Sequence, residues 1–222
     1  MAEFGLIGEG ITDQIVVENI LISHFNNPDL LVSYLQPLRD ATSDSIATTS
    51  GNWHKVLEYC GSTVFQESFQ RLDYIIIQID SDIFMSGEVP EKYRNIIHSN
   101  DEFETIIKKI QTIIIDSIGE DHYNRFEERI IFAISVHSIE CWLLPIYYST
   151  QKAKAGKATG CLETLNKALQ QQENFYIDEK KPEYYRKIAR KFLKMKPKEF
   201  SSCVKMNPSL NFFISSLAPL TP

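Results

Sequence analysis

The feature of this 222-residue chain that most constrains its fold is the apolar run Tyr74-Ile75-Ile76-Ile77-Gln78-Ile79, which leads directly into Asp80-Ser81-Asp82. A run rich in β-branched residues is typical of a strand buried on both faces, as in the middle of a parallel sheet. Parallel strands need crossover connections, which are usually helices. The run therefore predicts an α/β domain in which two aspartates follow the end of a central strand.

Apolar periodicity predicts the other elements of such a domain. We expect strands at residues 4–7, 30–35 and 129–136, and helices at residues 12–25, 53–69, 103–118, 162–173, 182–194 and 208–217. Gly61 should break the second helix and Gly119 should end the third. Residues 137–148 are expected to be a helix or a strand running into one, and residues 40–52, 84–100 and 149–160 to be loops or a linker.

These elements predict a mostly parallel, Rossmann-like sheet flanked by helices at residues 1–150, with a helical C-terminal extension at residues 151–222 packed on it. An apolar content of 43% is enough for a substantial core. No apolar run approaches the roughly 20 residues that a membrane span needs, and the first residues lack a basic leader. We therefore expect a cytoplasmic protein with no membrane partner.

The four cysteines support the same location. Cys60, Cys141, Cys161 and Cys203 are widely and irregularly spaced, which predicts neither a disulfide framework nor a zinc site of the CxxC type. We expect all four to be reduced thiols.

The charge of the chain is polarised along its length. A net charge of −6 argues against a nucleic-acid partner, but residues 151–205 contain 14 Lys and Arg against 6 Asp and Glu. Lys187, Arg190, Lys191 and Lys194 recur at helical spacing and could bind phosphates, although a solvated helical face is the alternative. His54 and Lys55, which follow a Ser-Gly-Asn turn, form a second candidate phosphate contact.

Acidic side chains recur where the predicted strands end. Glu9 stands between two glycines after the first strand, Asp13 falls in the first turn of the next helix, and Glu140 follows the last strand in apolar surroundings. Because parallel strands end at one edge of a sheet, these residues and Asp80 and Asp82 are expected to meet there. Carboxylate oxygens favour Mg²⁺ or Mn²⁺, so one or two such ions are predicted.

Each acid also has a structural interpretation. Acids in a DxD pair are common in turns and helix caps, and Asp13 is favourably placed for the helix dipole. A buried Glu140 could be paired with a lysine or arginine, and the nearby His137 could be a ligand, a base or a core histidine. The chain contains no complete P-loop, dinucleotide-binding, HExxH or GxSxG motif.

Four blocks of the chain resemble a known family. Gly8-Glu9-Gly10-x-Thr12-Asp13 and Asp80-Ser81-Asp82 resemble the glutamate turn and the DxD motif of the TOPRIM domain. The segments Ile139-Glu140-Cys141-Trp142-Leu143-Leu144 and 207–213 are similar to motifs of small bacterial TOPRIM proteins related to OLD nucleases, many of them associated with phage defence. The residues after the DxD motif, Ile83-Phe84, depart from the glycine or third acid of that family.

The resemblance implies a metal-dependent nuclease that cleaves DNA or RNA, acting as a phage-defence or toxin effector, either with a defence-system partner protein or as a homo-oligomer. It implies that Glu9 is a general acid/base or metal ligand, that Asp80 and Asp82 are metal ligands, that Glu140 binds a second metal and that Asp13 supports the site.

Two other functions fit the same sequence. The first is a non-catalytic TOPRIM-fold subunit or scaffold of a larger defence complex, with Trp142, Tyr147, Tyr148 and Phe212 as contact candidates. The second is another enzyme with a DxD motif, such as a nucleotide-sugar transferase, for which the chain offers no recognisable nucleotide pocket.

Overall fold

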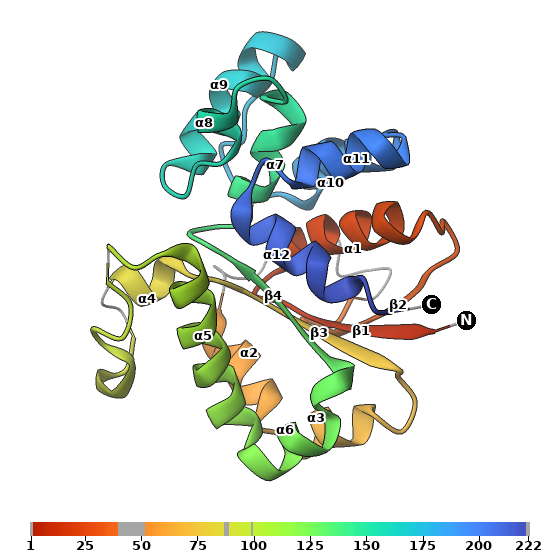
Figure 1. Ribbon diagram of the computed structural model, residues 1–222, viewed down its shortest axis with the longest axis vertical. Coiled ribbons are helices and arrows are strands. Elements are labelled where there is room, and N and C mark those ends of the chain that lie inside the picture. The colour runs from red at the N-terminus through yellow and green to blue at the C-terminus, as the bar shows by residue number, and fades with distance from the viewer. Residues whose placement is uncertain (1, 40–51, 87–88, 99, 221–222) are drawn as a thin grey trace.

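The computed structural model describes residues 2–39, 52–86, 89–98 and 100–220, and its centre is a four-stranded parallel sheet (Figure 1). The strands are β1 (Glu3–Ile7), β2 (Leu31–Gln36), β3 (Tyr74–Asp80) and β4 (Ile130–Ser135), in the order β2-β1-β3-β4. This confirms the α/β class and the parallel sheet. All but the last residue of the loop expected at residues 40–52 lies outside the described residues.

The apolar run that constrains the fold becomes β3, one of the two inner strands. It pairs with β1 on one side, where Ile7 lies opposite Ile77, and with β4 on the other, where Asp80 lies opposite Ser135. From Ile75 to Asp80 every residue of β3 is buried. All four strands run in the same direction, so the segments that follow β1, β3 and β4 leave the sheet at the same edge.

One face of the sheet is covered by helices from the first two thirds of the chain (Figure 1). They are α2 (Trp53–Cys60), α3 (Thr63–Ser68), α4 (Asp82–Ser86), α5 (Phe103–Ile118) and α6 (Glu120–Phe126), with 3₁₀ turns η2 (Glu91–Tyr93) and η3 (Glu127–Arg129). The apolar stripe of α5, which includes Ile106, Ile110 and Ile113, is buried against this layer. Gly119, with a φ of 86°, ends α5 as its sequence predicts.

The other face is covered by the first helix and by the C-terminal helices (Figure 1). These are α1 (Ile11–Phe25), α7 (Glu140–Tyr147), α8 (Lys152–Ala155), α9 (Cys161–Glu173), α10 (Pro182–Leu193), α11 (Pro197–Val204) and α12 (Pro208–Leu217). The apolar side of α10, with Tyr185, Ile188 and Phe192, packs against α1 within one continuous core. The helices after residue 150 therefore share their core with the strand–helix unit that carries Glu9.

Several elements differ from the sequence-based expectations. The short helices α6 and α11 were not predicted, and the segments expected to be loops at 84–100 and 149–160 contain part of α4, the turn η2 and the helix α8. The segment at 137–148 resolves into a helix that starts at Glu140. No helix in the described part of the chain is both long and apolar enough to cross a membrane.

The prediction of four reduced cysteines is wrong for two of them. Cys141 on α7 and Cys161 at the start of α9 form a disulfide with a Cα–Cα distance of 5.0 Å, whereas Cys60 and Cys203 are free and buried. The pair is 20 residues apart and becomes adjacent only because α9 packs on α7, which spacing alone does not reveal. The expected cytoplasmic location thus loses the support that reduced cysteines gave it.

Candidate active site

Five acidic side chains gather at the edge where β1, β3 and β4 end. Glu9 lies in the turn between β1 and α1, and Asp13 in the first turn of α1. Asp80 is the last residue of β3, and Asp82 and Glu140 are the first residues of α4 and α7. The structure therefore brings together all five acids that the sequence analysis selected, and we refer to them as the acid cluster.

Glu9 and Asp80 are joined through backbone and side-chain hydrogen bonds. The backbone N–H of Asp80 donates to Glu9 Oε1 at 2.7 Å, and the backbone N–H of Glu9 donates to Gln78 Oε1 at 3.2 Å. Gln78 Nε2 in turn donates to Asp80 Oδ1 at 2.9 Å, and the hydroxyl of Ser135 donates to the same oxygen. Gln78 and Ser135 fix the position of the Asp80 carboxylate, and sequence reasoning missed both.

Asp13 is buried at the base of the cluster with an unsatisfied oxygen. Its Oδ2 receives a long contact of 3.5 Å from the hydroxyl of Thr12, and Oδ1 has no hydrogen-bond partner among the described residues. A buried carboxylate oxygen without a donor is energetically costly. The acid cluster therefore contains an acceptor for which a cation would be a suitable partner.

Lys180 provides the positive charge of the cluster. It lies in the segment between α9 and α10, and its Nζ is 3.4 Å from Glu140 Oε1, which also accepts a hydrogen bond from the Tyr185 hydroxyl. The lysine side chain is 48% exposed, whereas that of Glu140 is 2% exposed. Glu140 thus has the lysine partner that its apolar surroundings suggested as one alternative, and no sequence pattern distinguishes Lys180 from the other C-terminal lysines.

Burial and mutual repulsion raise the pKa values of four of the acids. Burial, with the charge of Asp13 next, raises the pKa of Glu9 to about 8. Burial, opposed by the ammonium of Lys180, raises the pKa of Asp13 to about 6. The pKa of Asp80 lies well above its ordinary value because of burial and the charges of Asp13 and Glu9, and burial also raises the pKa of Asp82.

The fifth acid behaves in the opposite way. Burial works to raise the pKa of Glu140, but the ammonium of Lys180 and the hydrogen bonds from Ser138 and Tyr185 outweigh it and hold this pKa below its ordinary value. Burial likewise works to lower the pKa of Lys180, and the charges of Asp13, Glu140 and Asp80 raise it instead. Glu140 and Lys180 therefore form an ionised pair beside acids that tend to hold protons.

His137 lies beside the cluster in an unusual backbone conformation. Its φ is 72°, its carbonyl accepts the N–H of Asp82 at 3.0 Å, and its Nδ1 is buried without a partner among the described residues. Potential ligand atoms of His137, Cys141 and Cys161 lie within 4.8 Å of one another. Because the two sulfurs are bonded to each other, they are not available to a metal in this state.

The chemistry of the acid cluster fits a hard divalent cation. Carboxylate oxygens are the ligands that Mg²⁺ and Mn²⁺ prefer, and a cation would relieve the repulsion that raises the pKa values. The carboxylates are placed more loosely than in a metal shell, since no three of them bring oxygens within 4.8 Å of one another in the described structure. The ammonium of Lys180 supplies the neutralising charge in this arrangement.

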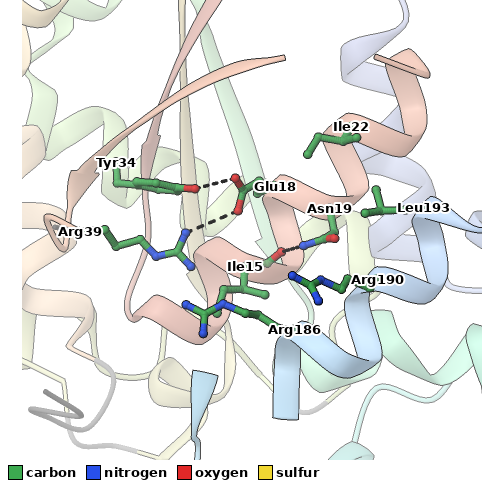
Figure 2. A pocket seen from close by; sticks show the side chains of 9 residues that line it. All are labelled: Ile15, Glu18, Asn19, Ile22, Tyr34, Arg39, Arg186, Arg190 and Leu193. Atoms are coloured by element: carbon green, nitrogen blue, oxygen red, sulfur yellow. Dashed lines mark hydrogen bonds and ion pairs between the residues drawn. The ribbon is translucent and has the colours of Figure 1, made fainter. Parts of the chain in front are cut away.

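The predicted phosphate contacts are divided between the two faces of the sheet. Lys187 and Lys191 on α10 pair with Glu173 at 3.5 Å and 2.9 Å, Lys194 is exposed, and Arg190 lines a pocket between α1 and α10 (Figure 2). His54 and Lys55 are exposed on α2, which covers the opposite face. The predicted contacts therefore do not form one continuous surface.

Tyr184 and Tyr185 lie on α10 beside its basic residues, where a tyrosine ring could stack on a base or pack within the fold, and both have structural contacts. Tyr184 stacks on Phe175 with a distance of 5.8 Å between ring centroids. Tyr185 is fully buried and donates its hydroxyl hydrogen to Glu140. Tyr185 therefore supports the acid cluster through Glu140 and does not offer a surface for a base.

Comparison with known proteins adds no relative. No protein-family model matches the chain, and neither a curated protein nor a solved structure is detectably similar to it. The resemblance to TOPRIM proteins therefore stays a prediction that depends on the motifs quoted above.

Proposed function

We propose that the chain is a Mg²⁺- or Mn²⁺-dependent phosphodiesterase that cleaves nucleic acid at the acid cluster. The observation that carries this proposal is the convergence of five carboxylates from three strand ends, four of them with raised pKa values, and an unsatisfied buried oxygen on Asp13. Such an arrangement stores electrostatic repulsion that a structural role does not require. A divalent cation or a proton relieves it.

The cation would be held by the carboxylates of Asp80, Asp82 and Glu9, which would have to move closer together to bind it, and Asp13 and Glu140 are the remaining acids of one or two such sites. When bound, it would supply a positive charge for the phosphodiester and lower the pKa of a water molecule. Asp80 is the best oriented of these ligands because Gln78 and Ser135 fix its carboxylate.

Two side chains of the cluster have the protonation properties that phosphodiester hydrolysis needs. Glu9, with a pKa of about 8, can hold or release a proton near neutral pH and is our candidate general acid or base. Lys180 stays charged and could neutralise negative charge on a phosphate oxygen. Glu140 contacts the ammonium of Lys180, and the Tyr185 hydroxyl donates to Glu140. The role of Glu140 and Tyr185 is therefore to position Lys180.

The substrate class rests on the charge distribution. Residues 151–205 carry the 14 basic residues, and α10 extends from the segment that holds Lys180. A polyanion is the ligand that such a surface attracts. A role as a phage-defence or toxin effector is an expectation from the resemblance alone.

Incubation of the purified chain with plasmid DNA, single-stranded DNA and total tRNA in Mg²⁺ or Mn²⁺ tests this function. We expect cleavage that EDTA abolishes and that Asp80→Asn lowers by roughly 100-fold or more, since a ligand that fixes the cation is lost. Glu179→Gln, which removes an exposed acid next to Lys180, should leave the rate unchanged. Cleavage that persists in Asp80→Asn would rule out the acid cluster as the active site.

One observation favours a non-catalytic subunit as a second candidate. The ammonium of Lys180 already neutralises the cluster, as in a site that has lost its metal. Three of the four contact candidates predicted for such a subunit, Trp142, Tyr147 and Tyr148, are buried in the chain's own core, whereas the fourth, Phe212, is half-buried. Failure of both the wild type and Lys180→Ala to bind Mn²⁺ or cleave any substrate would favour this candidate.

A further inference from the structure

A pocket of about 460 Å³ lies between α1 and α10, on the face of the sheet that α1 and the C-terminal helices cover (Figure 2). This volume is within the range of about 300–1000 Å³ that is usual for small-molecule sites. Three arginines line it: Arg39, which follows β2, and Arg186 and Arg190 on α10. Glu18 is the one acidic residue among the described residues that line it.

Arg39 is the arginine of the pocket whose buried guanidinium is best placed to bind an anion. Its side chain is only 10% exposed, and its guanidinium lies over the Tyr34 ring at 4.2 Å from the centroid. One terminal nitrogen reaches Glu18 Oε2 at a long 3.5 Å, while the buried Nε has no acceptor among the described residues. A buried guanidinium donor without an acceptor is costly, so this position favours an anionic ligand.

Glu18 only partly neutralises the arginines. Its Oε1 accepts a hydrogen bond from the Tyr34 hydroxyl at 2.5 Å, so one of its oxygens is already committed. Arg190 is exposed on α10, and its side chain makes no hydrogen bond or ion pair with another described residue. Figure 2 shows the guanidinium groups of Arg39, Arg186 and Arg190 turned toward the space between β2 and α10. Among the described residues that line the pocket, the positive charges of Arg39 and Arg190 are therefore only partly balanced by Glu18.

The remaining wall is apolar. Ile15 and Ile22 contribute from α1, and Leu193, which is 43% exposed, contributes from the end of α10. Planar guanidinium groups match the geometry of phosphate oxygens, and an apolar wall suits the rest of an organic ligand. A ligand that combines a phosphate with an apolar or aromatic part would contact both the arginines and the apolar side chains of the pocket.

From this arrangement we infer that the pocket binds a phosphate ester of nucleotide size. The ester could belong to a free nucleotide or to one unit of a nucleic-acid backbone, and the chemistry that the arginines recognise is the same. The site is distinct from the acid cluster and needs no divalent cation. The inference therefore does not depend on the proposed nuclease activity.

Isothermal titration calorimetry in EDTA tests the inference with three probes: AMP, inorganic phosphate and a short single-stranded oligonucleotide. We expect AMP to bind more tightly than inorganic phosphate, because only AMP reaches the apolar wall. Arg190→Ala should weaken AMP binding about tenfold or more, the effect of losing a charged hydrogen bond. Lys194→Ala removes the same charge one turn away and outside the pocket, so it should change the affinity less than about twofold.

Glu18→Gln provides a test with the opposite sign. It removes the negative charge from the pocket but keeps an oxygen that accepts the Tyr34 hydroxyl, so AMP affinity should increase. A folding defect would not produce tighter binding.

The two sources of the phosphate are separated by the probes. Loss of AMP binding in Arg190→Ala assigns the pocket to a nucleotide, whereas loss of oligonucleotide binding alone assigns it to the nucleic-acid backbone. The inference is overturned if the wild type binds no probe, if Arg190→Ala and Lys194→Ala weaken binding equally, or if Glu18→Gln weakens it.

Discussion

Lys180 is the residue that balances the charge of the acid cluster. It interacts with Asp13, Asp80 and Glu140, and its Nζ lies 3.4 Å from Glu140 Oε1. Without this ammonium, Glu140 would be a buried carboxylate held by neutral donors alone. A single lysine thus determines whether the metal-free cluster is tolerated.

We expect Lys180→Met to lower the free energy of unfolding in EDTA at neutral pH by about 1–3 kcal/mol, less than for a fully buried pair because the lysine is half exposed. Lys181→Met is the matched control, since Lys181 pairs only with the exposed Glu179 and should have an effect within about 0.5 kcal/mol. Urea unfolding measures both. Equal effects of the two variants would show that Lys180 does not balance the cluster.

The raised pKa of Glu9 predicts how the stability of the folded chain depends on pH. With folded pKa values raised, Glu9, Asp13 and Asp80 hold protons in the folded chain that they have lost in the unfolded chain. Between about pH 5 and pH 8 the folded state therefore binds more protons, and stability falls as pH rises. Glu140, with its lowered pKa, acts in the opposite direction only at lower pH, near and below its ordinary value of 4.5.

Unfolding in EDTA at pH 5 and pH 8 measures this effect. From pH 5 to pH 8, we expect the free energy of unfolding of the wild type to fall by on the order of 3 kcal/mol more than that of Glu9→Gln, because the glutamine cannot ionise. Comparison with the variant removes the contribution of His24, whose buried imidazole has a lowered pKa. Equal pH dependence in the two proteins would contradict the raised pKa of Glu9.

At the residue scale, the sequence predicted those site residues whose position follows from a strand end. Glu9, Asp80 and Glu140 each follow a recognisable apolar run, and parallel strands end together. Lys180 could not be predicted in this way, because its place depends on how the C-terminal helices pack on α1 and α7.

At the scale of elements, the disulfide between α7 and α9 connects the helix that begins at Glu140 with the helix that precedes Lys180. Asn166 on α9 also exchanges two hydrogen bonds with the backbone of Ile177, three residues before Lys180. Cys141 and Cys161 therefore stabilise the segment that supplies the positive charge to the acid cluster.

Closure of a 20-residue loop by this disulfide predicts a stabilisation of about 3 kcal/mol. Urea unfolding of the wild type with and without a phosphine reductant should show this difference. The double variant Cys141→Ser/Cys161→Ser should not respond to the reductant, which separates the disulfide from effects on Cys60 and Cys203. Four titratable thiols in the denatured, unreduced wild type would contradict the disulfide.

Element boundaries were predictable where one signal dominates. Apolar spacing and Gly119 define α5 as the sequence predicts, and the β-branched run defines β3. The helix α11 was missed because its eight residues are too few to show a clear apolar period, although Pro197 at its first turn is a helix start signal. The order of the strands follows from packing of both faces, for which the sequence offers no local signal.

At the scale of the whole molecule, the acidic and basic parts of the chain meet at one site. The acids come from residues before 150, whereas Lys180 and Tyr185 come from the basic C-terminal part, and both parts share one apolar core. A cluster completed by segments so distant in sequence depends on the complete fold. We expect a divalent cation to bind there because it would replace repulsion between carboxylates with attraction.

Isothermal titration of Mn²⁺ into the metal-free chain at pH 8 shows whether the acid cluster binds a divalent cation. We expect saturable binding by the wild type, at least tenfold weaker binding by Asp80→Asn, and unchanged binding by the exposed-acid control Glu179→Gln. Affinity should decrease as the pH falls toward 5, because Glu9, Asp13 and Asp80 then hold protons. Equal Mn²⁺ affinity in the wild type and Asp80→Asn, or no binding by the wild type, would contradict a cation site at the acid cluster.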